Sequence, residues 1–184
     1  MRVTASPNER PDARRLQGSE YVDDDGSADR ALATALAADA GDATGASYPV
    51  VLAALATARL LVPVVAVLGE VEVGDDGLAR DKTSDMAAVL LTGADGRMAL
   101  LAFTDLTTLA AWDPQARPVP VAAHLAAATA VQEGAAALVV DVAGPHPFVV
   151  EGDDLVRIAS GWRPVRLDDG GWGWLGSADE HVAD

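Results

Sequence analysis

Residues 86–112 constrain the fold of this chain more than any other stretch. Two apolar runs, 86–91 and 98–103, flank a short polar segment that contains Ala94-Asp95-Gly96. Asp and Gly tolerate the positive φ angles that tight hairpin turns require, so the pattern predicts two antiparallel strands joined by a turn. Because both strands are apolar on both sides, the sequence alone leaves their register open.

A helix is predicted directly after the second strand. Thr104 is a suitable N-cap, and Asp105 then lies in the first turn, where the helix dipole favours a negative charge. The helix is expected to end before Pro114. Of the two hairpin faces, we expect the bulkier one to be buried, which consists of Val89, Leu91, Leu101 and Phe103.

Helical and extended patterns alternate along the rest of the chain. Helices are predicted over residues 28–38, 49–59, 121–133 and 153–160. Further strands are predicted over residues 60–68, 136–142 and 148–150, and a short one over 70–73.

Single residues refine three of these elements. Ser27 is expected to cap the first helix, and Gly134 to end the one over 121–133. Pro63 lies within a predicted strand, which favours a sheet edge or a bulge at that point. The inward residues predicted for the helix over 121–133 are Val121, Leu125 and Ala128.

Strands interleaved with helices, together with one antiparallel hairpin, predict an α/β (α+β) domain with a mixed β-sheet and helices packed on it. The 184 residues suffice for one domain with a sizeable core. We place that domain at residues 27–160. Residues 1–26 are rich in charge and turn formers and are predicted to be a disordered arm, and 161–184 form an acidic tail rich in Gly and Trp.

Composition excludes several classes of function. The chain has no cysteine, which removes disulfides, thiolate metal sites and cysteine nucleophiles. Its net charge of −15 opposes nucleic-acid binding, which depends on Lys and Arg neutralising phosphates. The simplest interpretation of the acidity is solubility.

We expect neither secretion nor a membrane span. Residues 1–15 are polar and contain no apolar segment that resembles a signal peptide. Residues 50–68 approach spanning length, but Arg59 at their centre is costly in a bilayer and Pro63 interrupts a helix there. A cytoplasmic protein is therefore expected.

Catalytic and cofactor motifs are missing from the sequence. Residues 171–176 match G-x-G-x-x-G by letter, but they are not placed between a strand and a helix and enclose two tryptophans. His124, His146 and His181 show no metal-ligand spacing. We therefore expect no cofactor, no metal and no enzymatic activity.

Four segments resemble the N-terminal domain of the bacterial SseB family. They are Leu60-Leu61-Val62-Pro63-Val64, Lys82-Thr83-Ser84-Asp85-Met86, Asp95-Gly96-Arg97 with Phe103-Thr104-Asp105, and Ala137-Leu138-Val139-Val140-Asp141 with Ala143-Gly144-Pro145. The resemblance covers roughly residues 27–160. It implies an α/β domain without an established activity and supplies no catalytic residues.

Five residues are candidates for binding, and for each of them a purely structural role is also possible from the sequence. Lys82 lies in a polar loop that suits a small anion or simply leads into a strand. Thr104 and Asp105 follow a strand, where α/β sheets often bind ligands, but a helix cap accounts for both. Trp172 and Trp174 suit a docking peptide, since Trp is enriched in binding hot spots, or they fold back onto the sheet.

These observations predict a non-catalytic domain that binds or regulates a protein partner. The alternative is a small-molecule sensor, or an enzyme that uses carboxylates near Thr104 and Asp105. The sequence does not give the oligomeric state.

Overall fold

Strands β4 (Leu90–Thr92) and β5 (Met98–Ala102) form the predicted hairpin. They belong to a computed structural model that describes residues 2–4, 21, 23–67 and 85–176. In the turn, the Gly93 N–H donates to the Arg97 carbonyl at 2.8 Å. Gly96 has a φ of 81°, which its lack of a Cβ permits. The hairpin prediction is therefore confirmed.

The sequence predicted one strand for the first apolar run. In the structure, this run divides between two sheets instead. Its beginning lies in β3 (Asp85–Ala88), which pairs with β2 (Arg59–Val67). Val89 separates β3 from β4, and its N–H donates to the Pro63 carbonyl at 3.2 Å. Because both halves of the run are apolar, its sequence gives no sign of the change of sheet.

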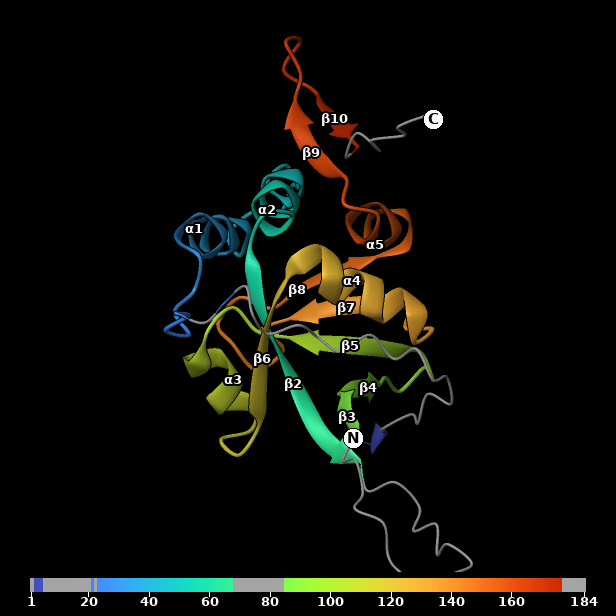
Figure 1. The fold of residues 1–184 in the computed structure, drawn as a ribbon. Coiled ribbons are helices and arrows are strands. Elements are labelled where there is room, and N and C mark those ends of the chain that lie inside the picture. Colours follow the sequence, from blue (N-terminus) through green and yellow to red (C-terminus); the bar gives the residue numbers. More distant parts are fainter. Residues whose placement is uncertain (1, 5–20, 22, 68–84, 177–184) are drawn as a thin grey trace, which may run out of the picture.

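The larger sheet has the strand order β1-β4-β5-β7-β8, where β1 is Arg2–Thr4, β7 is Ala137–Val140 and β8 is Phe148–Glu151. Strands β5 and β7 are parallel, and the other neighbours are antiparallel (Figure 1). The structure thus confirms a mixed sheet in an α+β fold.

A smaller sheet has the order β3-β2-β6, with β6 at Arg117–Ala122, so β2 is its middle strand. The expected edge position of Pro63 is wrong, and β2 runs through it unbroken. The N–H and C=O of Leu61 both bond Phe103, on the side away from β6. Because Pro63 is two residues after Leu61, its backbone nitrogen and carbonyl also face away from β6. The missing N–H of Pro63 therefore removes no hydrogen bond to Pro118, the residue opposite it in β6.

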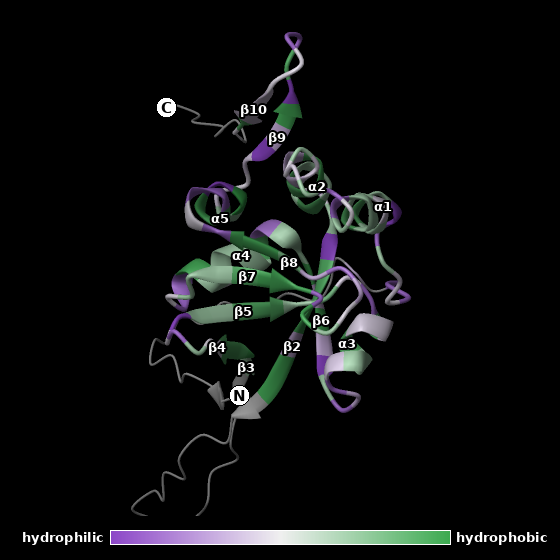
Figure 2. Ribbon diagram, turned by 180° about the vertical axis from the view of Figure 1, so that it is seen from behind, coloured by the Kyte–Doolittle hydropathy of each residue, from purple (hydrophilic) through white to green (hydrophobic). Residues whose placement is uncertain are grey.

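Four helices cover one face of the larger sheet and enclose the main core (Figures 1 and 2). They are α1 (Arg30–Asp39), α2 (Tyr48–Leu55), α4 (Ala123–Gln132) and α5 (Gly152–Ala159). Helix α3 (Leu106–Trp112) lies on the opposite face over a second cluster. That cluster contains Leu61, Val89, Leu101, Phe103 and Leu109, with Leu91 packed against it, so the predicted hairpin face is buried. The other face is buried too, because Leu90 and Leu100 belong to the main core.

Helix α4 buries a different face from the one predicted. Leu125 is 45 % exposed, and Val121 belongs to β6 instead. The buried residues of the helix are Ala123, Ala126, Ala127 and Ala130. A stripe of alanines allows the helix to approach its neighbours closely, whereas larger side chains were expected to mark the core. Gly134, with a φ of 70°, follows the helix end as predicted.

The N-terminal region also differs from expectation. Asp29, and not Ser27, caps α1, since its carboxylate accepts the Leu32 N–H at 3.0 Å. The expected disorder through residue 26 is wrong for its last residues, because Asp24 forms an ion pair with Arg59. Arg2–Thr4 likewise pair with β4 as a strand.

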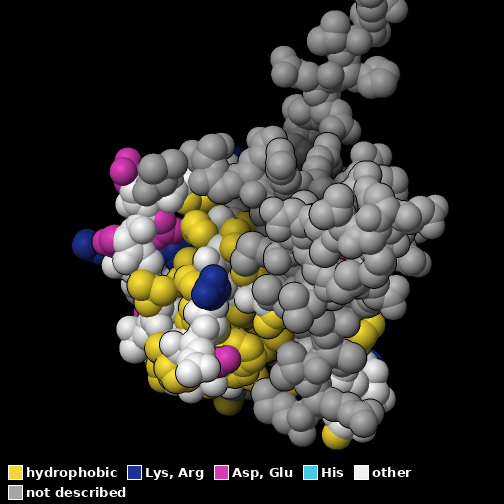
Figure 3. Space-filling view, turned by 60° about the horizontal axis from the view of Figure 1, so that its bottom comes forward, with side chains coloured by type: hydrophobic (Ala, Val, Ile, Leu, Met, Phe, Trp, Pro, Cys, Tyr) yellow, Lys and Arg dark blue, Asp and Glu magenta, His cyan; other side chains and the backbone are white. Residues whose placement is uncertain are grey.

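The chain continues past α5 into an antiparallel hairpin of β9 (Arg163–Arg166) and β10 (Trp172–Leu175). It projects from the helical side of the molecule (Figure 1). At the opposite end, apolar side chains of the described residues gather around a basic one (Figure 3). The predicted short strand at 70–73 lies outside the described residues.

Candidate functional site

Thr104 and Asp141 follow the parallel strands β5 and β7 and bind each other. The Thr104 N–H donates to Asp141 Oδ1 at 2.8 Å, and its hydroxyl donates to Oδ2 at 2.7 Å. Each residue is 4 % exposed. A buried carboxylate is stable only when it is hydrogen-bonded or paired, and Thr104 supplies both donors.

Asp141 has an unusual backbone conformation. Its φ is 53°, the one positive value of a non-glycine residue in the described part of the chain. Its N–H continues the β5–β7 ladder by donating to the Ala102 carbonyl at 3.0 Å, and its own carbonyl accepts the Gly144 N–H at 2.8 Å. Asp tolerates this region better than most residues, so the chain turns sharply here while the carboxylate returns to Thr104.

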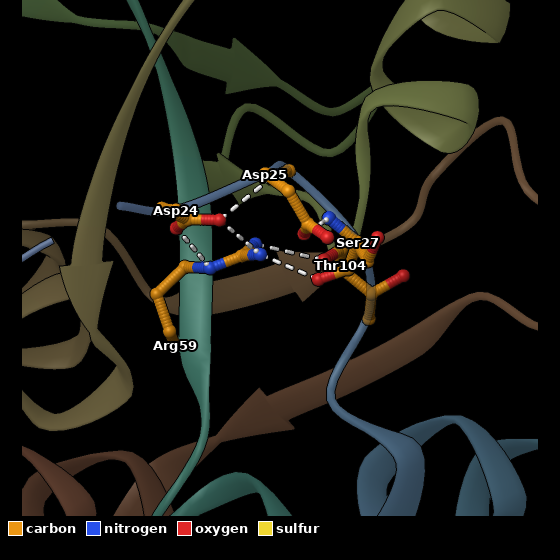
Figure 4. Close-up of polar contacts among 6 residues, drawn as sticks. Asp24, Asp25, Ser27, Arg59 and Thr104 are labelled. Atoms are coloured by element: carbon orange, nitrogen blue, oxygen red, sulfur yellow. Dashed lines mark hydrogen bonds and ion pairs between the residues drawn. The ribbon is translucent and has the colours of Figure 1, made fainter. Parts of the chain in front are cut away.

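Arg59, at the start of β2, connects Thr104 to the N-terminal segment (Figure 4). Its Nη1 donates to the Thr104 carbonyl at 3.0 Å. Its Nε and Nη2 lie 2.6 and 2.8 Å from the two carboxylate oxygens of Asp24, and Nη2 also reaches the Ser27 carbonyl. The Arg59 and Asp24 side chains are 13 % and 10 % exposed, so this two-point pair is largely shielded from water.

Residues 24–27 lie over the ends of the parallel strands. Gly26 is buried with a φ of 75°, and its carbonyl accepts the Leu106 N–H at 3.0 Å. The positive φ makes any other residue at position 26 strained, and a Cβ there would also displace the Leu106 side chain, whose Cδ1 would lie 2.4 Å away. Beside it, hydrogen bonds from Ser27 hold the pKa of the exposed Asp25 carboxyl below its ordinary value. This segment therefore covers the position at which α/β sheets often bind ligands.

Thr104 and Asp105, two of the predicted binding residues, both make contacts that stabilise the fold. The predicted capping role of Thr104 is wrong, because Asp105 is the N-cap of α3 and its carboxylate accepts the Thr108 N–H at 2.8 Å. Thr104, one residue earlier, turns inward to Asp141. Lys82 lies outside the described residues.

The other two candidate residues lie on one face of the β9–β10 hairpin. Trp172 and Trp174 stand opposite Arg166 and Pro164. Arg166 lies over the Trp172 ring, 5.2 Å from its centroid. Trp174 packs against the main core, and Arg157 of α5 lies 5.3 Å from its ring centroid. This inner face attaches the hairpin to the helices.

The opposite side of the hairpin is mostly apolar, and it exposes two leucines and an arginine beside a half-buried centre at Val165 and Gly173. Strand alternation places five residues there, which we call the outer hairpin face: Arg163, Val165, Leu167, Gly173 and Leu175. Leu167 is 44 % exposed and Leu175 is 48 % exposed. A Cβ on Gly173 would lie 3.0 Å from Leu167 Cδ2, so the leucine side chain lies across the glycine.

A hollow of about 250 Å³ lies between the end of α1 and the loop after β7. Leu36, Asp39 and Ala40 line one side, and Pro145, His146 and Pro147 the other. His146 Nδ1 is buried without a hydrogen-bond partner among the described residues. Asp39 Oδ1 accepts the Ser47 hydroxyl at 2.6 Å.

Sequence reasoning missed three residues of the polar network. Asp24 was assigned to a disordered arm, and Arg59 was considered only as an obstacle to membrane insertion. Asp141 carried a signal, since it is the one polar residue in an apolar run. On the hairpin, the i, i+2 spacing of Trp172 and Trp174 indicates that they share a face, which leaves Leu175 on the other.

A mixed sheet with four helices on one face and α3 on the other, closed at its strand ends by a buried polar network, defines an α+β domain. The family model described as "SseB protein N-terminal domain" matches residues 32–157, so the chain belongs to the SseB family. No curated protein and no solved structure matches the chain. Within the described residues, no helix is long and apolar enough to cross a bilayer, and no cluster of three or more His, Asp or Glu suits a metal ion.

Proposed function

We propose that this chain is a non-catalytic module that binds a protein partner through the outer hairpin face. The observation that carries the proposal is the exposure of Leu167 and Leu175 on one side of a projecting hairpin. Exposed apolar residues that gather on one surface are typical of interaction sites, whereas single ones are common everywhere. The inner face holds the hairpin in position, so the outer face is presented on a fixed element.

The chemistry of the strand ends supports a role other than catalysis. The Thr104 hydroxyl donates to one Asp141 oxygen and the Thr104 N–H to the other, and the Asp105 carboxylate caps α3. Arg59 is occupied by Asp24 and two carbonyls. Side chains used in this way are not free to act as a nucleophile or a general base on a substrate.

The proposal is tested by affinity capture with the full chain as bait. The Leu167→Glu/Leu175→Glu variant places two charges on the outer face and is expected to lose a partner that the unchanged chain recovers. Leu125→Glu is the matched control, because Leu125 is exposed to a similar extent on α4. Equal recovery by all three baits would refute the role of the hairpin.

The hollow at His146 favours a second candidate function, the binding of a small molecule. The Asp39 carboxylate and the carbonyl end of α1 make its rim negative, which suits an amine or a guanidine. In a thermal-shift screen of small amines, a stabilising compound is expected to lose its effect on His146→Ala and to keep it on His124→Ala. A compound that stabilises both variants equally binds elsewhere.

A further inference from the structure

We infer that the partner of the outer hairpin face is a second copy of this chain, an inference that rests on the proposed function. Two copies are placed face to face, with their hairpins antiparallel about a two-fold axis. The axis passes by the cross-strand pair of Val165 and Gly173, at the middle of the face. Such an interface is isologous, because the same residues contribute from both sides.

The charges along the hairpin fit this arrangement. Its base carries Arg163, and its tip carries Asp168 and Asp169, all exposed. An antiparallel pair places each base beside the tip of the other copy, so Arg163 of one copy meets Asp168 of the other. Neither side chain has an ion-pair partner among the described residues of its own chain.

Apolar contacts fill the centre of the same arrangement. Val165, Leu167 and Leu175 of both copies meet there, and the missing side chain of Gly173 leaves room for Leu167. Packed sheets stand about 10 Å apart with their side chains interlocked, which these residues suit. Pairing removes from water the leucines that the monomer exposes, which is the driving force for association.

The expected dimer is weak and reversible. Two short strands from each copy bury less surface than the roughly 800 Å² per partner of a standard interface, which is typical of transient complexes. Each copy carries a charge of −15, so repulsion opposes association at low salt. Close to physiological ionic strength this repulsion is screened beyond about 8 Å, whereas pairs in contact persist.

Sedimentation velocity over a concentration series of the full chain tests the inference. The weight-average mass is expected to rise reversibly from the monomer value towards twice that value. Arg163→Glu and Asp168→Arg are each expected to weaken association at least tenfold, because each places like charges together. The double variant exchanges the charges and is expected to restore association.

Two controls separate this inference from the proposed function. Arg117→Glu makes the same change in net charge as Arg163→Glu, at an exposed arginine of β6, and is expected to leave association unchanged. Circular dichroism confirms that each variant is folded. A chain that remains monomeric, or a double variant no better than the singles, overturns the second-copy inference. Hairpin-dependent capture of a different protein by such a chain leaves the proposed function standing.

Discussion

Thr104 supplies both donors to a carboxylate that has almost no access to water. Asp141 must be accommodated at the end of β7, where neither its charge nor its φ of 53° is intrinsically favourable. The two hydrogen bonds from Thr104 offset that cost. We therefore regard Thr104 as a residue that maintains the turn after β7.

Replacing Thr104 with valine keeps the shape of the side chain and removes its hydroxyl donor. Asp141 Oδ2 then remains buried with an unmet hydrogen bond, and the free energy of unfolding is expected to fall by about 1–3 kcal/mol. Urea denaturation measures the change. Thr107→Val, at an exposed position of α3, is the control and should alter stability by no more than about 0.5 kcal/mol. Equal effects of the two substitutions would contradict this role of Thr104.

At the scale of elements, Tyr48 connects α2 to β8 and α5. Its ring packs against Phe148 with 5.2 Å between centroids, and its hydroxyl donates to Asp154 Oδ2 at 3.3 Å. Burial, reinforced by the negative charge of Asp154, raises the pKa of Tyr48 to about 12. The folded protein thus holds the phenol proton more tightly than the unfolded chain.

This raised pKa predicts a loss of stability in alkali. An unfolded tyrosine ionises near pH 10, at about its ordinary pKa, so between about pH 10 and 12 the unfolded state binds fewer protons and stability falls as pH rises. Tyr48→Phe removes the ionisation, and its unfolding free energy is expected to fall less steeply over that range. Urea denaturation at a series of pH values measures the two slopes. Parallel slopes would show that Tyr48 does not contribute.

At the scale of the whole molecule, Arg59 connects the N-terminal segment, the smaller sheet and the strand ends of the larger one. Arg59→Leu leaves Asp24 without its counter-charge and two carbonyls without a donor. Removing one partner of a buried pair is expected to cost about 3–5 kcal/mol. Thermal and urea unfolding report the loss.

A matched substitution distinguishes burial from the mere presence of an ion pair. Arg97 also pairs with carboxylates, those of Asp95 and Glu151, but its side chain is 64 % exposed. Arg97→Leu is therefore expected to cost less than about 1 kcal/mol. If it destabilises the fold as much as Arg59→Leu does, the shielding of Arg59 from water is not what matters.

Short-range patterns predicted those parts of the molecule that depend on short-range contacts. The turn at residues 93–97 and the end of α4 at Gly134 followed from neighbouring residues. The polar network did not, because Thr104 binds Asp141 37 residues later and Arg59 binds Asp24 35 residues earlier. The face of α4 was predicted wrongly because close packing selected alanines over the larger Leu125.

The prolines of β6 have a consequence for how copies of this chain meet. Pro118 and Pro120 stand opposite Pro63 and Leu61, whose backbone groups point away from β6. The backbone carbonyls of both β6 prolines therefore point away from β2, towards the open edge of the sheet. This edge of the sheet offers the carbonyl oxygens of Pro118 and Pro120 but no N–H group at either residue. A strand from another molecule would find too few donors there to extend the sheet, so the edge resists fibre-like stacking.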